Sequence, residues 1–158
     1  MNRVDSNIKI DGKEIDNTTT KCEFISLFYN ELRKHNDKTK VFRFKNSIEI
    51  EGFNSWIIVA FNDLDKLSFI QINDANPELV NSYENWSNYK AKLTKESQDN
   101  FIKSILGKPD NIRPGSIEYL LDWATITSYE DPRSGDSAIS IRIIGIKPEF
   151  YISEEGLI

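Results

Sequence analysis

The sequence predicts an α+β protein in which helices pack on one face of antiparallel β-sheet. Two segments place apolar residues at helical spacing, which is the pattern of helices with one buried face. Around these segments, short runs alternate apolar and polar residues, as half-buried strands do. The loops between the runs are short, whereas parallel neighbours would need long crossover connections. The length of 158 residues and the hydrophobic content of 39% suit one compact domain over residues 1–158.

A short hairpin and a helix come first. Alternation on both sides of Asp11-Gly12 predicts the hairpin. Thr20 and Glu23 have the spacing of a capping box, so a helix is expected to begin there. It should run for about fifteen residues and end at His35. Its buried face would carry the apolar residues Phe24, Leu27, Phe28 and Leu32.

Four runs with strand character follow, at residues 41–44, 48–51, 56–61 and 67–72. Their short loops predict a meander in which each run pairs with the next one. The run from Trp56 to Phe61 is apolar on both faces, which is typical of a central strand. Trp56 is therefore expected in the core.

A second helix is expected to end at Leu106, because Gly107 and Pro109 are residues that terminate helices. Its start stays open between Pro77, which suits a first helical turn, and a second beginning near Thr94.

The last third of the sequence is rich in strand residues again. Residues 117–129, with Trp123 as an expected core residue, should pair with residues 137–143 as a long hairpin. The tail at residues 150–155 is expected to add a short strand or to cover a sheet edge. Residues 1–75 and 76–158 would then share one order, a helix followed by antiparallel strands. Two similar helix-plus-meander modules and one unrepeated domain both fit this order.

The charge balance argues against nucleic acid as a partner. The 25 acidic residues outnumber the 20 basic ones and give a net charge of −5, whereas nucleic-acid-binding domains are usually basic. We therefore expect no nucleic-acid partner.

The N-terminal segment lacks the apolar core of a secretory signal, and the longest apolar run, of six residues, is too short to span a membrane. These observations predict a cytoplasmic protein without membrane contact.

The sequence contains few groups for catalysis. One Cys and one His are too few for a zinc cluster, and no glycine motif for a nucleotide is present. Cys22 is expected to be a buried thiol and His35 a solvated residue at a helix end, and thirteen helical residues would hold them about 20 Å apart. We therefore expect no enzyme, no metal and no cofactor.

The alternative is an enzyme or small-ligand carrier whose site combines scattered residues. Glu49 and Glu51 would share one strand face and are candidates for such a site. The same two carboxylates also fit a solvated polar face without a function, or an acidic patch for a basic partner.

The predicted partner-binding residues are Trp86, Asp131, Arg133 and Asp136. Arg133 lies between the two carboxylates in a turn, and its planar fork of donors suits a carboxylate or phosphate. Trp86 has polar neighbours and is the Trp expected to be exposed. In the alternative interpretation, the charged residues only satisfy the turn and Trp86 packs beneath it.

Two family resemblances add to this interpretation. Leu106-Gly107-Lys108-Pro109, followed by a strand with Trp123, resembles the helix-plus-meander module of the SmpA-like outer-membrane assembly lipoproteins. Tandem copies of that kind of module build the β-lactamase inhibitory protein. Residues 123–143, with the turn at 131–136, also look like the small immunity proteins encoded beside bacterial toxins. The resemblance implies a non-enzymatic inhibitor that binds another protein, such as a basic toxin domain, and it assigns no site residues because these modules bind through variable surfaces.

Overall fold

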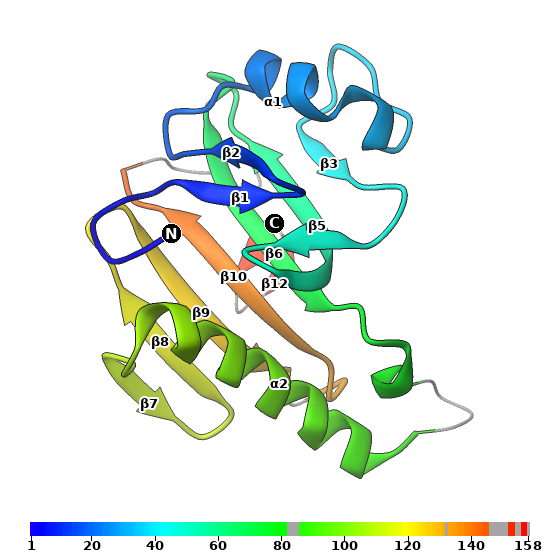
Figure 1. Cartoon of the computed structure of the whole chain (residues 1–158), viewed down its shortest axis with the longest axis vertical. Helices are drawn as coiled ribbons and strands as arrows, with labels where there is room; N and C mark the ends of the chain where they lie inside the picture. The colour runs from blue at the N-terminus through cyan, green and yellow to red at the C-terminus, as the bar shows by residue number, and fades with distance from the viewer. Residues whose placement is uncertain (82–85, 132, 146–151, 154–155, 158) are drawn as a thin grey trace.

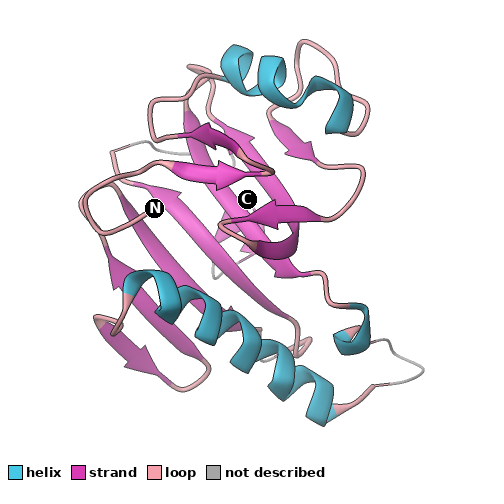
Figure 2. Cartoon of the chain, viewed as in Figure 1, coloured by secondary structure: helices cyan, strands magenta, loops and turns pink. Residues whose placement is uncertain are grey.

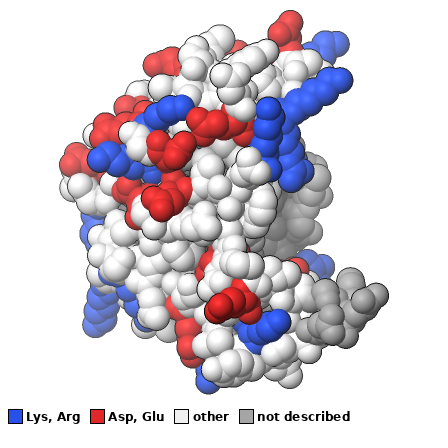
Figure 3. Space-filling view, turned by 45° about the vertical axis from the view of Figure 1, so that its right-hand side comes forward, with Lys and Arg blue, Asp and Glu red and all other residues white. Residues whose placement is uncertain are grey.

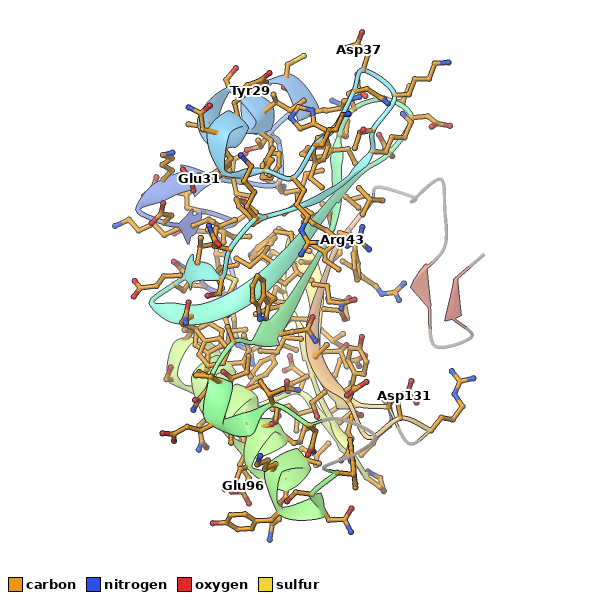
Figure 4. All side chains as sticks on the ribbon, turned by 90° about the vertical axis from the view of Figure 1, so that its right-hand side faces the viewer. Tyr29, Glu31, Asp37, Arg43, Glu96 and Asp131 are labelled. Atoms are coloured by element: carbon orange, nitrogen blue, oxygen red, sulfur yellow. The ribbon has the colours of Figure 1, made fainter. Side chains whose placement is uncertain are left out.

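A computed structural model describes residues 1–81, 86–131, 133–145, 152–153 and 156–157 of the chain. Within these residues, ten strands form one antiparallel sheet in the order β2-β1-β4-β5-β6-β10-β9-β8-β7, and β3 pairs with β5 (Figures 1 and 2). The helices α1 and α2 lie on the same side of this sheet, on the left in the side view of Figure 4. The predicted α+β class with helices on one face is confirmed.

The N-terminal part contains β1 (Ile8–Ile10), β2 (Lys13–Ile15) and α1 (Lys21–Phe28). The predicted capping box is present, since the Glu23 amide donates to Thr20 Oγ1 at 3.2 Å and the Thr20 amide donates to Glu23 Oε1 at 3.1 Å.

The predicted length of the first helix is wrong. The helix ends at Phe28 and passes into the short 3-10 helix η1 (Tyr29–Glu31). Leu32 is extended and forms a bridge with Phe44, and the Arg33 amide donates to the Arg43 carbonyl at 2.8 Å. Pairing with a distant strand therefore replaces the helical hydrogen bonds that the apolar spacing predicted.

The next strands are β3 (Val41–Arg43), β4 (Ile48–Ile50), β5 (Phe53–Phe61) and β6 (Leu67–Asp74). The predicted meander of four neighbours is wrong at its start, because β3 and β4 both pair with β5. At nine residues, β5 is long enough for β4 to pair with its first part and β3 with its later part. Trp56 is 45% exposed on the face turned away from the helices, so its predicted core position is also wrong.

The second half begins with the 3-10 helix η2 (Pro77–Leu79) and continues with α2 (Asn88–Leu106). The long helix thus starts neither at Pro77 nor near Thr94, because the Ser87 hydroxyl caps it by accepting from the Lys90 amide. Its predicted end at Leu106, before Gly107, is confirmed.

The remaining strands are β7 (Asn111–Arg113), β8 (Ser116–Leu120), β9 (Ala124–Glu130) and β10 (Ser137–Ile143). The predicted pairing of the last two long segments is confirmed by β9 and β10, but residues 117–129 form two strands with Trp123 in the turn between them. Trp123 is buried, as predicted. In the tail, β11 (Ile152–Ser153) pairs with β12 (Gly156–Leu157), and residues 150–151 and 154–155 of the predicted segment lie outside the described residues.

The core fills the space between the helices and one face of the sheet. Phe24 and Phe28 of α1 pack among the rings of Phe42, Phe44 and Phe61, with centroids 5.1–6.1 Å apart. Under α2, the inward residues of the sheet include the predicted stripe Ile139, Ile141 and Ile143 and, beside it, Ile126. None of the helices among the described residues is both long and apolar enough to span a membrane.

The halves of the chain meet through the antiparallel pair β6–β10 in the middle of the sheet (Figure 1). Each half places a helix before four strands, α1 before β3 to β6 and α2 before β7 to β10. That the halves are a true repeat stays a prediction.

Candidate functional site

A hollow of about 370 Å³ opens at one end of the sheet, where the segment after β6, the first turns of α2 and the β9–β10 turn meet. Three of the four predicted contact residues, Trp86, Asp131 and Asp136, line this hollow. We call it the turn hollow. Arg133 does not line it, and its side chain is 77% exposed on the same turn.

Trp86 forms one wall of the turn hollow. Its indole Nε1 donates to Asn88 Oδ1 at 2.9 Å, and its side chain is 43% exposed. The ring lies against Gly135, so closely that a Cβ atom there would stand 2.6 Å from two ring carbons. Gly135 also has a φ of +75°, which side chains disfavour. The β9–β10 turn and the tryptophan therefore fit together only because this position is glycine.

The turn itself is held by its own hydrogen bonds. Asp131 Oδ1 accepts from the Arg133 amide at 2.8 Å, and the Gly135 amide donates to the Asp131 carbonyl at 2.7 Å. The hydrogen bond from the Arg133 amide is the main reason why the pKa of Asp131 lies below its ordinary value. Asp131 thus satisfies the turn, as the alternative interpretation expected, and it also presents a charge to the hollow.

A third carboxylate, Asp74 at the end of β6, joins the two on the turn. Asp74 accepts from the Ser97 hydroxyl at 2.7 Å, which fixes its position beside α2. Asp136 is exposed, and no described residue contacts its carboxylate by a hydrogen bond or ion pair. Among the described residues that line the turn hollow, none is Lys, Arg or His. Its charge is therefore negative.

Sequence reasoning missed several residues of the turn hollow. Asp74 and Asn73 come from β6, and Tyr129 comes from β9. Burial raises the pKa of the Tyr129 hydroxyl, and the charge of Arg142 opposes this shift in part. The β6–β10 pairing brings Asn73 and Asp74 to the hollow, so no local sequence signal marks them, whereas Tyr129 lies only two residues before Asp131 in the sequence. Ser137, which directly follows the predicted turn, could have been included from its place in the sequence.

A second hollow of about 390 Å³ contains the two glutamates of the alternative interpretation. Their predicted place on one strand face is wrong, because β4 ends at Ile50 and Glu51 has a φ of +48° in the following turn. Glu51 accepts from the Met1 amino group at 2.7 Å and from the Lys9 amide at 3.1 Å. Glu49 is exposed beside it, and in Figure 3 acidic side chains gather at the upper left, on the side that carries β1 and β2.

The expected environments of the single cysteine and histidine are both wrong. Cys22 is exposed, because the capped start of α1 turns Lys21 and Phe24 inward instead. His35 caps no helix, since α1 has already ended, and its half-buried ring packs between Tyr29 and Phe42 at centroid distances of 5.6 and 5.4 Å. In the part of the chain that the structure describes, no group of three or more His, Cys, Asp or Glu is arranged to hold a metal ion.

Comparisons with known proteins found no matching family model, no matching curated protein and no matching solved structure. The resemblances to SmpA-like modules and to immunity proteins therefore stay predictions.

Proposed function

We propose that this chain is a non-enzymatic protein-binding module, an immunity-type inhibitor that binds a basic bacterial toxin domain. The observation that supports this function is the turn hollow, because Trp86, Asp131 and Asp136 were expected as partner contacts and line one cavity. Arg133 stands exposed on the same turn and adds a donor at its side. A cytoplasmic location belongs to the same proposal, since such an inhibitor protects the cell that makes the toxin.

The physical argument rests on charge and on one aromatic anchor. A net charge of −5 and a negative hollow favour encounter with a basic surface. Trp86 is half exposed and already held by Asn88 and Gly135, so little side-chain entropy is lost when a partner covers it. Tryptophan in such a setting is a typical hot-spot residue of protein interfaces.

The direct test uses the protein encoded by the neighbouring gene. Co-expression should protect bacterial cells from that protein, and calorimetry with the purified pair should give a dissociation constant. Trp86→Ala should weaken binding by at least about fivefold per folded molecule, in addition to the stability lost with the buried surface of its ring. Asp136→Ala should weaken binding less than Trp86→Ala and mainly at low salt.

Asp37→Ala is the matched control for charge. Asp37 is exposed at the end of the molecule that carries α1, far from Asp131 in the side view (Figure 4), and this variant should bind like the wild type. Absence of both protection and binding would overturn the proposed function. Equal affinities for the wild type, Trp86→Ala and Asp136→Ala would leave the inhibitor but remove the turn hollow from its interface.

The second hollow favours a second candidate, a small-ligand carrier or enzyme. Its observation is Glu49, which lies exposed in a hollow of about 390 Å³ beside the internally paired Glu51. A thermal-shift screen with cationic metabolites tests it. A ligand that raises the melting temperature of the wild type but not of Glu49→Gln would favour this candidate over the inhibitor.

A further inference from the structure

Three of the described residues that line the turn hollow carry a negative charge, and none of them carries a positive one. Asp74, Asp131 and Asp136 contribute three carboxylates from two separate segments of the chain. Arg133 approaches Asp131 from outside, with Nε 3.6 Å from Oδ1, and this exposed pair gives little screening inside the hollow. A bound cation would therefore be the natural counter-charge.

One buried hydroxyl in the wall of the turn hollow lacks a partner. Ser137 is 7% exposed, and its Oγ has no hydrogen-bond partner among the described residues, but this oxygen exposes less than 1 Å² of surface. Its carbonyl, by contrast, accepts from Asn73 Nδ2 at 3.0 Å. A ligand in the hollow would reach the hydroxyl only if it rotated about the Cα–Cβ bond, so the exposed carboxylate of Asp136 is the group that can hold a ligand directly.

The walls of the hollow suit a flat cation. The indole of Trp86 forms one side and Tyr129 another, and aromatic faces attract guanidinium groups. A guanidinium has five donors in a fixed plane, which suit a carboxylate, whereas an ammonium is a compact point charge. A volume of about 370 Å³ lies at the lower end of the range for ligand sites, which fits one side chain better than a large cofactor.

From these observations we infer that the turn hollow binds an arginine side chain of the partner protein. This inference rests on the proposed function and adds the recognition element to it. The partner's guanidinium would donate to the exposed Asp136 carboxylate while it lies beside the Trp86 ring. Asp131 and Asp74 are held by hydrogen bonds within the chain and would act through their charge.

The test measures binding of small probes to the full chain by NMR, with no toxin present. N-acetyl-arginine amide should shift the signals of the Trp86 indole NH and of the amides of Gly135 and Ser137. N-acetyl-citrulline amide has nearly the same shape without the charge, and it should leave these signals unchanged at the same concentration. Asp136→Asn should weaken arginine binding by about threefold or more, and higher salt should weaken it in the wild type.

Asp37→Asn carries the same charge change at the distant end of the molecule and should leave arginine binding unchanged. Equal shifts with the citrulline probe, or no shifts with arginine, would overturn the inference. Equal binding of N-acetyl-lysine amide would overturn the choice of arginine. The two proposals fail separately: a toxin bound without any arginine effect leaves the proposed function standing, and arginine binding without any toxin partner leaves only the pocket.

Discussion

The contact between Gly135 and Trp86 makes Gly135→Ala the most informative substitution in this chain. The new methyl group would stand 2.6 Å from two ring carbons, whereas carbon atoms in contact are normally about 3.5–4.0 Å apart. The ring must therefore move by roughly 1 Å. In addition, alanine at a φ of +75° is strained, at a cost of about 1–2 kcal/mol.

Gly115 in the β7–β8 turn separates the two effects. It has a φ of +78°, and a Cβ there would meet nothing within 4 Å, so Gly115→Ala reports the backbone strain alone. Trp86 is 43% exposed, which leaves roughly 100 Å² of an aromatic side chain covered. If the displaced ring loses about half of this buried area, the free energy of unfolding falls by about 1 kcal/mol at about 25 cal/mol per Å². Gly135→Ala should thus lower the free energy of unfolding by about 1 kcal/mol more than Gly115→Ala.

Urea denaturation of both variants, each with and without Trp86→Ala, measures this difference. In the Trp86→Ala background there is no ring to displace, so Gly135→Ala and Gly115→Ala should cost the same within about 0.5 kcal/mol. The reasoning would be refuted by equal costs in the wild-type background, or by an excess cost of Gly135→Ala that persists without the tryptophan.

Three further predictions concern the elements that hold the fold. Thr20→Ala should lower the free energy of unfolding by about 1 kcal/mol through loss of the capping box, and Thr20→Ser should restore most of it in the same urea titration. Gln98 is buried, and its Nε2 donates to Ser128 Oγ and to the Tyr129 and Ala138 carbonyls. Gln98→Leu should therefore lower the free energy of unfolding by about 1–3 kcal/mol. Faster hydrogen exchange of the backbone amides of β9 and β10 would show where the structure is weakened. Hydrogen bonds from Thr18 hold the pKa of Asp16 below its ordinary value of 3.8, so the folded chain binds this proton less tightly than the unfolded chain does. The resulting stability is present above the unfolded pKa and is lost as the pH falls through the lower folded value. The difference in the free energy of unfolding between the wild type and Asp16→Asn should therefore be largest above pH 3.8 and should shrink as the pH falls below that value, and a difference that does not change with pH would contradict the assignment.

Local signals in the sequence predicted the elements whose boundaries depend on a few neighbouring residues. The capping box at Thr20 and the terminating Gly107 are of this kind, and both boundaries are confirmed. The fold class follows in the same way from alternation and short loops. The errors occur where distant segments decide, as at Leu32, whose bridge with Phe44 ends a helix that its apolar spacing would have continued.

The residues of the turn hollow show the same difference between local and distant signals. Asp131, Asp136 and their turn were predicted from turn-forming residues that are close together in the sequence. Asp74 was not, because it joins the hollow only through the pairing of β6 with β10, whereas Tyr129, two residues before Asp131, could have been included. Trp56 was placed in the core since its run is apolar on both sides, but its strand presents it to the face without helices.

The β6–β10 pair also determines how the chain reaches its native state. Asn73 and Ser137, which meet across this pair, lie 64 residues apart in the sequence, whereas the neighbouring pairs β5–β6 and β9–β10 join strands that follow one another. Closing so long a loop costs entropy before any contact rewards it. We therefore expect each half to assemble its hairpins before β6 docks against β10. The turn hollow is lined by residues of both strands, so it is complete only in molecules whose halves have joined.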